Sequence, residues 1–160
     1  MNPELSIALG SAVIALAALG ATIWQGFLTR RHNRLSVTPL LKLDRVVAHN
    51  KEIAVILKNT GVGPAIIQTY DIKVDGNLIQ GRGIARMRAA LDSLGLENYS
   101  FEIYTPFSDE ALAVGESTTL FISSPNSTDG ERKQIRAVVP RIQFIIRYKS
   151  IYGDESLLTG

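Results

Sequence analysis

The sequence predicts one N-terminal transmembrane α-helix followed by a mainly-β, immunoglobulin-like antiparallel sandwich with one or two inserted helices. Three observations carry this prediction. Residues 5–28 contain no Asp, Glu, Lys, Arg or His. Most later apolar residues alternate with polar ones, which is typical of half-buried strands. In a few short stretches the apolar residues recur at helical spacing instead. We therefore expect an anchor at residues 1–29, a basic juxtamembrane junction at 30–37 and a β-sandwich domain at 38–160.

The apolar stretch 5–28 is long enough to cross a bilayer. Its 24 residues extend about 36 Å as an α-helix, against a hydrocarbon core of about 30 Å. Burying Arg30 or Arg31 would cost about 2.5 to 3.5 kcal/mol each, so we expect the helix to end near Leu28. The alternatives are a cleaved signal peptide, which would have a basic start in place of MNPE, and a buried core helix, which is rarely this long without charge.

The charges around the span predict its orientation. Glu4 is the only charged side chain before it, whereas Arg30, Arg31 and Arg34 follow it closely. Lys and Arg next to a span are retained on the cytoplasmic side. We expect a single-pass protein of the cell inner membrane, with the N-terminus outside and the C-terminal domain cytoplasmic. Trp24 and the three arginines are expected at the membrane interface, where guanidinium groups contact anionic lipid.

The charge balance of the body argues against nucleic acid as a partner. Three of the 17 Lys and Arg and one of the 15 Asp and Glu precede Leu35, which leaves 14 of each sign in the body. Non-specific nucleic-acid binding needs a concentrated positive surface. Two local cationic clusters remain: Arg82, Arg86 and Arg88, and Arg132, Lys133 and Arg136. The chain has no cysteine, which excludes disulfides, thiolate catalysis and cysteine-based metal sites.

Strand signals follow one another along the body. Asp75-Gly76 is a hairpin signal that leads into Leu78-Ile79. Residues 129–139 are ambiguous between helix and loop: Asp129 is a candidate cap for a helix, and Pro140 would end it. Because the order is not strand-helix-strand throughout, an antiparallel sandwich is favoured over a parallel sheet. The strands are predicted over residues 36–45, 52–58, 70–74, 99–103, 118–122, 142–148 and 156–159.

A helix is predicted over residues 82–94, with Gly95 placed to end it. Its apolar residues recur at i, i+3, i+7 and i+10, on one face. Two roles are open. Either this face covers one end of the sandwich, or Arg82, Arg86 and Arg88 rest on anionic lipid while the face meets the bilayer. The apolar residues are Ile84, Met87, Leu91 and Leu94.

Small residues approximate one face of the predicted span. A face of this kind is typical of helices that pack together in membranes, although the segment holds six alanines and a small face also arises from them by chance. Self-association through this face is therefore a hypothesis. Its residues are Ser6, Gly10, Ala17 and Ala21.

No motif in the chain specifies a catalytic or cofactor site. Gly61-Val62-Gly63 lacks the third glycine of a dinucleotide fingerprint and the Gly-Lys-Ser/Thr of a P-loop, so it is interpreted as a tight turn that needs glycine backbone freedom. His32 and His49 have no carboxylate at a spacing that suggests a metal site. We therefore expect no catalytic residue, no cofactor and no metal.

Three segments carry a resemblance: RHNRLSVTP at 31–39, NTGVGPA at 59–65 and YKSIYGDE at 148–155. They are similar to the R-H-N-R-L-S-V-x-P junction, the N-x-G-x-G-P-A turn and the Y-x-S-x-Y-G-[DE] hairpin of a set of small, uncharacterised bacterial single-pass membrane proteins. The resemblance covers most of the chain. It implies an N-terminal anchor and a β-rich C-terminal domain, and it implies no activity and no functional residues.

These observations favour a membrane-anchored, non-enzymatic interaction or accessory protein that presents a β-sandwich at the cytoplasmic membrane surface. Its expected partners are the lipid bilayer, another membrane or juxtamembrane protein and a second copy of the chain, but not nucleic acid. The alternative is a small-ligand or lipid-head-group sensor, which would have a deep pocket with convergent polar groups. An enzyme is the third hypothesis, and it would need two facing carboxylates with raised pKa values in a cleft.

Overall fold

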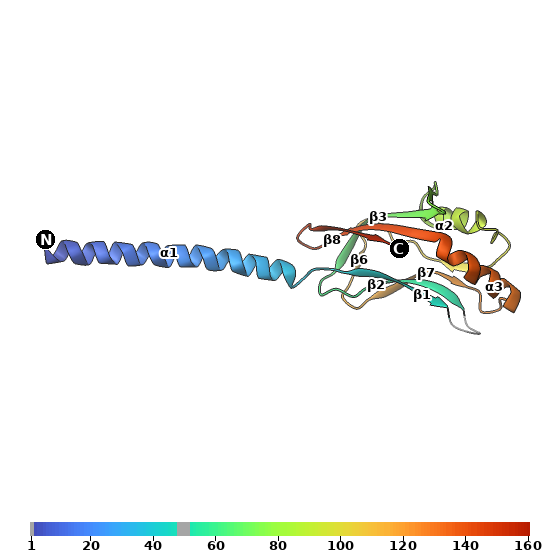
Figure 1. The fold of residues 1–160 in the computed structure, drawn as a ribbon, viewed down its shortest axis with the longest axis horizontal. Helices are drawn as coiled ribbons and strands as arrows, with labels where there is room; N and C mark the ends of the chain where they lie inside the picture. Colours follow the sequence, from blue (N-terminus) through green and yellow to red (C-terminus); the bar gives the residue numbers. More distant parts are fainter. Residues whose placement is uncertain (1, 48–51) are drawn as a thin grey trace. The chain divides into compact units, whose positions relative to one another are not determined.

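The computed structural model of the chain describes residues 2–47 and 52–160 (Figure 1). The chain divides into two units, one up to Ser36 and one from Val37 to Gly160. The first unit is a single helix, and the second consists of antiparallel β-sheets with two further α-helices. The prediction of an N-terminal helix followed by an antiparallel β-sandwich with inserted helices is confirmed.

Helix α1 spans Pro3–Leu35. Proline suits the first turn of a helix, where its missing N–H would have no partner. Within α1, Ile7–Leu35 is long and apolar enough to cross a membrane. The predicted end near Leu28 is wrong, since the helix continues for seven more residues. Arginine and leucine are good helix formers in water, so the polar residues after Leu28 do not end the helix.

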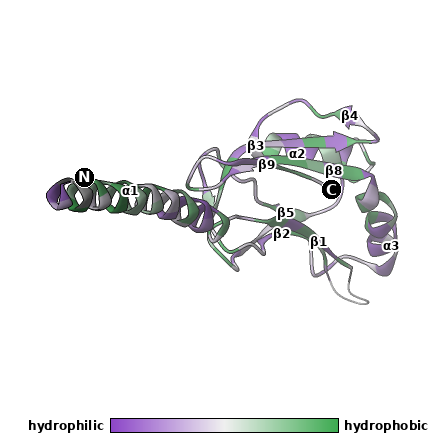
Figure 2. Cartoon of the chain, turned by 60° about the vertical axis from the view of Figure 1, so that its left-hand side comes forward, coloured by the Kyte–Doolittle hydropathy of each residue, from purple (hydrophilic) through white to green (hydrophobic). Residues whose placement is uncertain are grey.

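Two hydroxyl groups inside α1 are paired with the helix itself. Ser11 Oγ donates to the Ile7 carbonyl oxygen at 2.9 Å, and Thr22 Oγ1 donates to the Ala18 carbonyl oxygen at 2.8 Å. An unpaired hydroxyl in an apolar medium costs about 2 to 7 kcal/mol, so this pairing suits both groups to lipid. Figure 2 shows mostly green and pale residues along α1, with purple residues towards its ends.

The sandwich consists of two antiparallel sheets. The first has the strand order β1-β2-β7-β5, and the second has the order β4-β3-β8-β9, with the short strand β6 also paired to β3. Sequence reasoning missed β6, because two residues are too few to show alternation. The strands are β1 Leu41–Val47, β2 Ile53–Asn59, β3 Ala65–Val74, β4 Asn77–Leu78, β5 Phe101–Ile103, β6 Ala111–Leu112, β7 Ser117–Ser123, β8 Ile142–Lys149 and β9 Glu155–Thr159.

The predicted first strand begins too early. Residues 36–45 were expected to form it, but β1 begins at Leu41. The preceding residues pair with the loop after β2 instead: the Val62 N–H donates to the Thr38 carbonyl oxygen at 3.0 Å, and the Thr60 N–H donates to the Leu40 carbonyl oxygen at 2.8 Å. Those residues are therefore held to the domain as a paired loop segment.

The core lies between the two sheets and follows the period-two pattern. In β8, Phe144 and Ile146 are fully buried, and Tyr148 is 4% exposed. The Phe144 ring lies 6.0 Å from the Tyr70 ring of β3, measured between centroids. Burying a large apolar side chain contributes about 1.5 to 3 kcal/mol, so each of these alternating positions stabilises the sandwich.

Helix α2 spans Gly83–Asp92 and packs on the sandwich. Met87 and Leu91 of its predicted apolar face are fully buried, whereas Ile84 is 59% exposed. The face therefore covers the sandwich, which was the first of the two predicted roles. Gly95 has a φ of +75° and lies just after the helix, as predicted.

Helix α3 spans Asp129–Val138, which resolves the ambiguous stretch as a helix. The capping residue is Thr128 and not Asp129: the Thr128 side chain accepts from the Glu131 N–H, and the Glu131 side chain accepts from the Thr128 N–H at 2.6 Å. This reciprocal pair is a capping box. A short 3-10 turn, Val139–Arg141, follows and contains the proline that was expected to end the helix.

Candidate functional site

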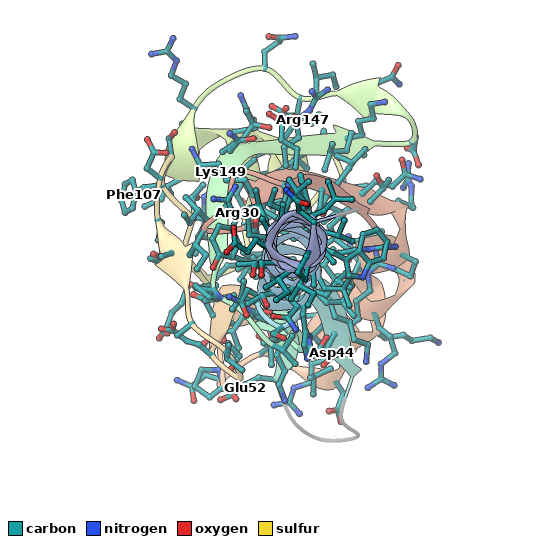
Figure 3. All side chains as sticks on the ribbon, turned by 90° about the vertical axis from the view of Figure 1, so that its left-hand side faces the viewer. Arg30, Asp44, Glu52, Phe107, Arg147 and Lys149 are labelled. Carbon is teal, nitrogen blue, oxygen red and sulfur yellow. The ribbon has the colours of Figure 1, made fainter. Side chains whose placement is uncertain are left out.

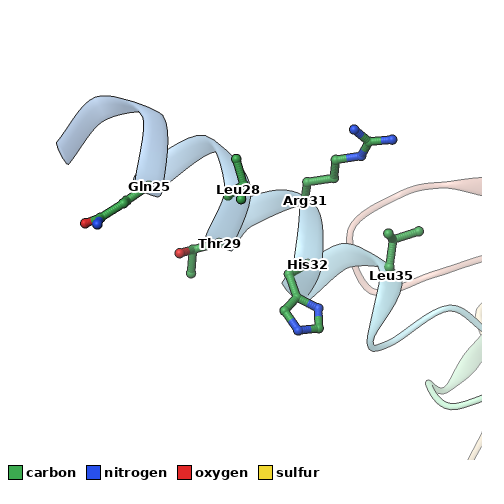
Figure 4. Close-up of a pocket in the computed structure, with 6 residues that line it drawn as sticks. All are labelled: Gln25, Leu28, Thr29, Arg31, His32 and Leu35. Atoms are coloured by element: carbon green, nitrogen blue, oxygen red, sulfur yellow. The ribbon is translucent and has the colours of Figure 1, made fainter. Parts of the chain in front are cut away.

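The predicted membrane-interface residues all lie on the C-terminal part of α1. Trp24 is 68% exposed, and Arg30, Arg31 and Arg34 are exposed as well. Along this stretch runs an open groove of about 570 Å³, shown in Figure 4. Apolar and cationic side chains thus share the same two turns, which is the composition that a membrane–water interface accommodates. The groove is lined by Gln25, Leu28, Thr29, Arg31, His32 and Leu35.

The predicted helix-packing face is open in this chain. Gly10, Ala17 and Ala21 are spaced by seven and four residues on one continuous helix, which places them near a single face. A Cβ atom added at Gly10 would meet nothing within 4 Å. The side chain of Ser6 lies outside the described part of the chain. Helix packing through this face stays a prediction.

The three arginines of the predicted surface-binding helix have different environments. Arg86 Nη1 donates to the Tyr70 carbonyl oxygen and to Asp71 Oδ1, the latter at 2.5 Å. Arg88 donates at 3.4 Å to a carbonyl oxygen just before β5. Arg82 is exposed. Two of the three guanidinium groups therefore hold α2 to the sandwich, and one faces solvent.

A cleft of about 640 Å³ lies beside the start of α2, between β3 and the loop before β6. Arg82 and Ser108 line it, together with Thr105, which is 7% exposed and whose Oγ1 has no hydrogen-bond partner among the described residues. Phe107 lies on its rim, is 72% exposed, and points outward at the edge of the domain in Figure 3. The cleft offers polar groups to a ligand, but it is open to solvent.

The structure places one of the two histidines. His32 lies on α1, and His49 lies outside the described residues. Within the described ranges, no group of three or more His, Asp or Glu side chains is placed to hold a metal ion.

The segment that follows α1 passes very close to the loop after β2. A Cβ atom at Gly63 would lie 1.8 Å from the Val37 carbonyl oxygen, and one at Gly61 would lie 2.3 Å from the Leu40 nitrogen. Neither glycine has a positive φ. The predicted reason for these glycines, the backbone freedom of a tight turn, is therefore wrong. They are required because only a hydrogen atom fits between the loop and segment 37–40.

Asn59 joins this segment to the rest of the sandwich. Its side chain is fully buried, and Nδ2 donates to the carbonyl oxygens of Gly63 at 2.8 Å and Leu112 at 3.0 Å. Oδ1 accepts from the N–H groups of Leu40 at 3.3 Å and Gly61 at 3.0 Å. An amide side chain has two donors and two acceptor sites, so the hydrogen-bonding capacity of Asn59 is complete.

Sequence reasoning missed this role of Asn59. The residue was grouped with the turn, but it continues the inward-facing series of Ile53, Val55 and Leu57 in β2, all fully buried. An asparagine at an inward position of a strand must find partners for its polar atoms. That position in the alternation was the available signal.

Two further turns lie at the same end of the sandwich. In the β6–β7 turn, the Gly115 N–H donates to the Asn59 carbonyl oxygen at 3.0 Å. In the β8–β9 turn, the buried Ser150 Oγ accepts from the N–H groups of Tyr152 at 3.1 Å and Asp154 at 3.2 Å. We call this end of the domain the Val37 end. It comprises segment 37–40, loop 60–64, turn 113–116 and turn 150–154.

Comparison with known proteins finds no family model that matches this chain and no matching curated protein.

Replacing Asn59 by Ala leaves buried backbone groups of three segments without partners. Each unsatisfied buried group costs about 1 to 3 kcal/mol, so we expect the free energy of unfolding to fall by about 2 to 4 kcal/mol. Thermal and urea unfolding of the full chain in mild detergent would measure this. The control, Asn98→Ala, removes an exposed side chain and should change the value by less than about 0.5 kcal/mol. Equal stability of the two variants would contradict the role of Asn59.

Gly63→Ala should displace segment 37–40, because the new methyl group overlaps the Val37 carbonyl group. We expect hydrogen exchange at the Val62 amide, which donates to this segment, to become at least tenfold faster. Gly130→Ala is the matched control, since its nearest neighbour would lie 4.0 Å away. Unchanged exchange in Gly63→Ala would contradict the close packing described here.

Arg86→Met should loosen α2 from β3. The substitution removes three hydrogen bonds and leaves Asp71 without its cation, so we expect a loss of about 1 to 3 kcal/mol in the free energy of unfolding. Arg82→Met, at the exposed residue that immediately precedes the same helix, should have little effect. Equal free energies of unfolding for the two variants would contradict the role of Arg86 in holding α2 to β3.

Proposed function

We propose that this protein is a membrane-anchored, non-enzymatic interaction or accessory protein that presents a β-sandwich at the cytoplasmic surface of the inner membrane. The observation that carries the proposal is the exposure of the apolar side chains of α1. None of its most hydrophobic window is buried, and Ile14, Leu19 and Phe27 are 71%, 56% and 67% exposed. Soluble monomers rarely expose contiguous apolar patches above a few hundred Å², and a bilayer is the solvent that removes this cost.

The proposed orientation rests on the charges at the two ends of α1. Glu4 lies in the first turn, and the three arginines lie in the last turns, on an unbroken helix. Cationic residues close to a span stay on the cytoplasmic side. Each can also gain about 1 kcal/mol from anionic head groups on that surface.

The strand order supports the immunoglobulin-like class for the domain. When the two-residue strand β6 is left out and the other strands are lettered in chain order, the sheets β1-β2-β7-β5 and β4-β3-β8-β9 follow the order A-B-E-D and C′-C-F-G of immunoglobulin-like sandwiches. Domains of this architecture carry many functions, so the class by itself names no partner.

The tether restricts the class of partner. The helix ends at Leu35 and the second unit begins at Val37, so the domain has no long linker with which to leave the membrane surface. Its partners are therefore proposed to be another membrane protein, a juxtamembrane segment or a second copy of this chain. Purification of the tagged full chain in mild detergent should retain one such protein in stoichiometric amount; the absence of any stable partner would contradict the accessory role.

A sensor of small ligands or lipid head groups is the second candidate, and the cleft beside α2 favours it. The exposed guanidinium of Arg82 and the unpartnered hydroxyl of Thr105 both belong to the lining of this cleft. Glycerol 3-phosphate is a suitable probe, because it is the anionic unit of a phospholipid head group. Binding should raise the unfolding temperature of the full chain, and Arg82→Ala should abolish the shift; no shift in the wild type would remove this candidate.

The proposed topology predicts the activity of reporters fused after Gly160. A fluorescent protein that matures in the cytoplasm should be active there, and alkaline phosphatase, which needs the periplasm, should be inactive. Replacing Arg30, Arg31 and Arg34 by Ala and Asn2 by Lys should shift a large fraction of molecules to the opposite orientation, because the cations then lie on the other side of the span.

The matched control neutralises three cations far from the span, Arg132, Lys133 and Arg136, and should leave the reporter pattern unchanged. The full chain should also stay with the membrane pellet at high pH. Alkaline phosphatase activity in the unaltered chain would contradict the proposed orientation, and release of the chain at high pH would contradict the anchor itself.

A further inference from the structure

The Val37 end of the sandwich carries exposed apolar side chains from four separate segments. They lie in short segments and turns that backbone hydrogen bonds hold in place, so their exposure is a property of the folded domain. Tyr152 adds a hydroxyl to an apolar ring, the combination enriched at membrane–water interfaces. The residues and their exposed fractions are Leu40 58%, Val62 62%, Val114 54%, Ile151 51% and Tyr152 51%. We call this set the apolar rim.

At the opposite end of the same strands, the turn between β3 and β4 is polar. The turn between β3 and β4 is Asp75-Gly76, and Arg141 binds Asp75 through two hydrogen bonds, at 2.9 and 2.5 Å. This bond is the main reason that the pKa of Asp75 is lowered. Single apolar side chains are exposed elsewhere on the domain, such as Val46 at 41% and Leu78 at 49%. The apolar rim differs from them because its five members come from four segments at one end of the sandwich.

If α1 is the proposed anchor, the short connection between α1 and the domain limits how far segment 37–40 can lie from the membrane. Past Leu28, α1 continues for about 10 Å, and the head-group layer of one leaflet is about 5 to 8 Å thick. Val37 follows Leu35 by two residues, so their Cα atoms are at most about 8 Å apart. Val62 lies against this segment, since its N–H donates to the Thr38 carbonyl oxygen.

The predicted lipid-binding helix is at a disadvantage by comparison. Arg86 of α2 is hydrogen-bonded to Tyr70 and Asp71. Strand β3 begins at the Val37 end with Ala65, and Tyr70 follows five residues later. At about 3.3 Å per residue this places the attachment of α2 about 17 Å away from that end. The apolar face of α2 is also already buried against the sandwich.

The four segments of the Val37 end carry two carboxylates, Glu116 and Asp154, and no Lys or Arg. Glu116 Oε2 accepts from the Ala113 N–H at 2.7 Å, and Asp154 Oδ2 lies 3.2 Å from Ser150 Oγ. Lys58 is exposed at the end of β2. Contact of this end with lipid would therefore be driven by burial of apolar side chains rather than by attraction to anionic head groups.

We propose that the apolar rim inserts into the interface of the bilayer that α1 spans, giving the domain a second, peripheral contact with lipid. Such loops bury apolar tips at the boundary between head groups and acyl chains, at a depth of about 5 to 10 Å. The inference rests on the proposed anchor. It adds that one face of the domain is held against the membrane, which leaves the Asp75 end and the cleft beside α2 directed to the cytoplasm.

The absence of cysteine from the chain allows a direct test with spin labels. Full-length single-cysteine variants Val62→Cys, Val114→Cys and Tyr152→Cys would be reconstituted in phosphatidylcholine vesicles and labelled with a nitroxide. Accessibility to oxygen, which concentrates in lipid, and to a water-soluble nickel chelate would be measured. The matched controls are Leu78→Cys and Ile84→Cys, which are 49% and 59% exposed and lie away from the Val37 end.

We expect the three rim labels to be at least fivefold less accessible to the nickel chelate than the controls, while remaining accessible to oxygen. Adding phosphatidylglycerol should leave this difference unchanged. Rim labels as accessible to the nickel chelate as the label at Leu78→Cys would overturn the proposal. Rim labels inaccessible to both reagents would also overturn it, because they would indicate a contact with protein. Lipid exposure at Ile84→Cys alone would assign the contact to α2 instead.

Failure of this inference is distinguishable from failure of the anchor. The measurement is made on protein that stays in the membrane at high pH. In that protein, rim labels that are fully accessible to the nickel chelate contradict only the contact between the apolar rim and lipid. A chain that is extracted at high pH contradicts the anchor, and the rim contact is overturned with it.

Discussion

The packing of segment 37–40 against the glycine loop, completed by Asn59, is the constraint on which the rest of the domain depends. The segment passes so close to Gly61 and Gly63 that a methyl group at either position would overlap its backbone. The buried Asn59 side chain then bonds the segment, the loop and β6 at once. A buried amide is costly when any of its groups is unpaired, so these four bonds form together or are lost together, and they define where the domain begins.

This arrangement has a consequence for function. A domain that begins immediately after a membrane-spanning helix stays at the surface only if its first residues belong to the fold; otherwise they act as a linker. Here the Val62 N–H bonds Thr38 and the Thr60 N–H bonds Leu40, so the chain is held to the domain from its first residues. The proposed anchor, the proposed partner class and the proposed lipid contact of the apolar rim all use this short connection.

The helices and strands could be predicted from the sequence because their patterns are local. Alternation in β2 and β8 and the hairpin signal at Asp75-Gly76 predicted strands that the structure contains, because a strand with one face in the core must alternate. The apolar face over 82–94 predicted α2 in the same way. The sequence did not predict the hydrogen-bond partner of each polar side chain. Arg86 was a candidate for lipid, yet it bonds Asp71, fifteen positions earlier.

The sequence by itself determined a helix long and apolar enough to cross a membrane, its cationic end and the sandwich class. Hydrophobic length, charge asymmetry and period-two alternation each act within a few neighbouring residues. Only the tertiary structure decided that the glycines of loop 60–64 serve close packing, that Asn59 joins three segments, and that exposed apolar tips from four segments gather at the Val37 end. These features depend on contacts between residues far apart in the chain, such as Asn59 and Leu112. Such contacts depend on the complete fold, and no local pattern encodes them.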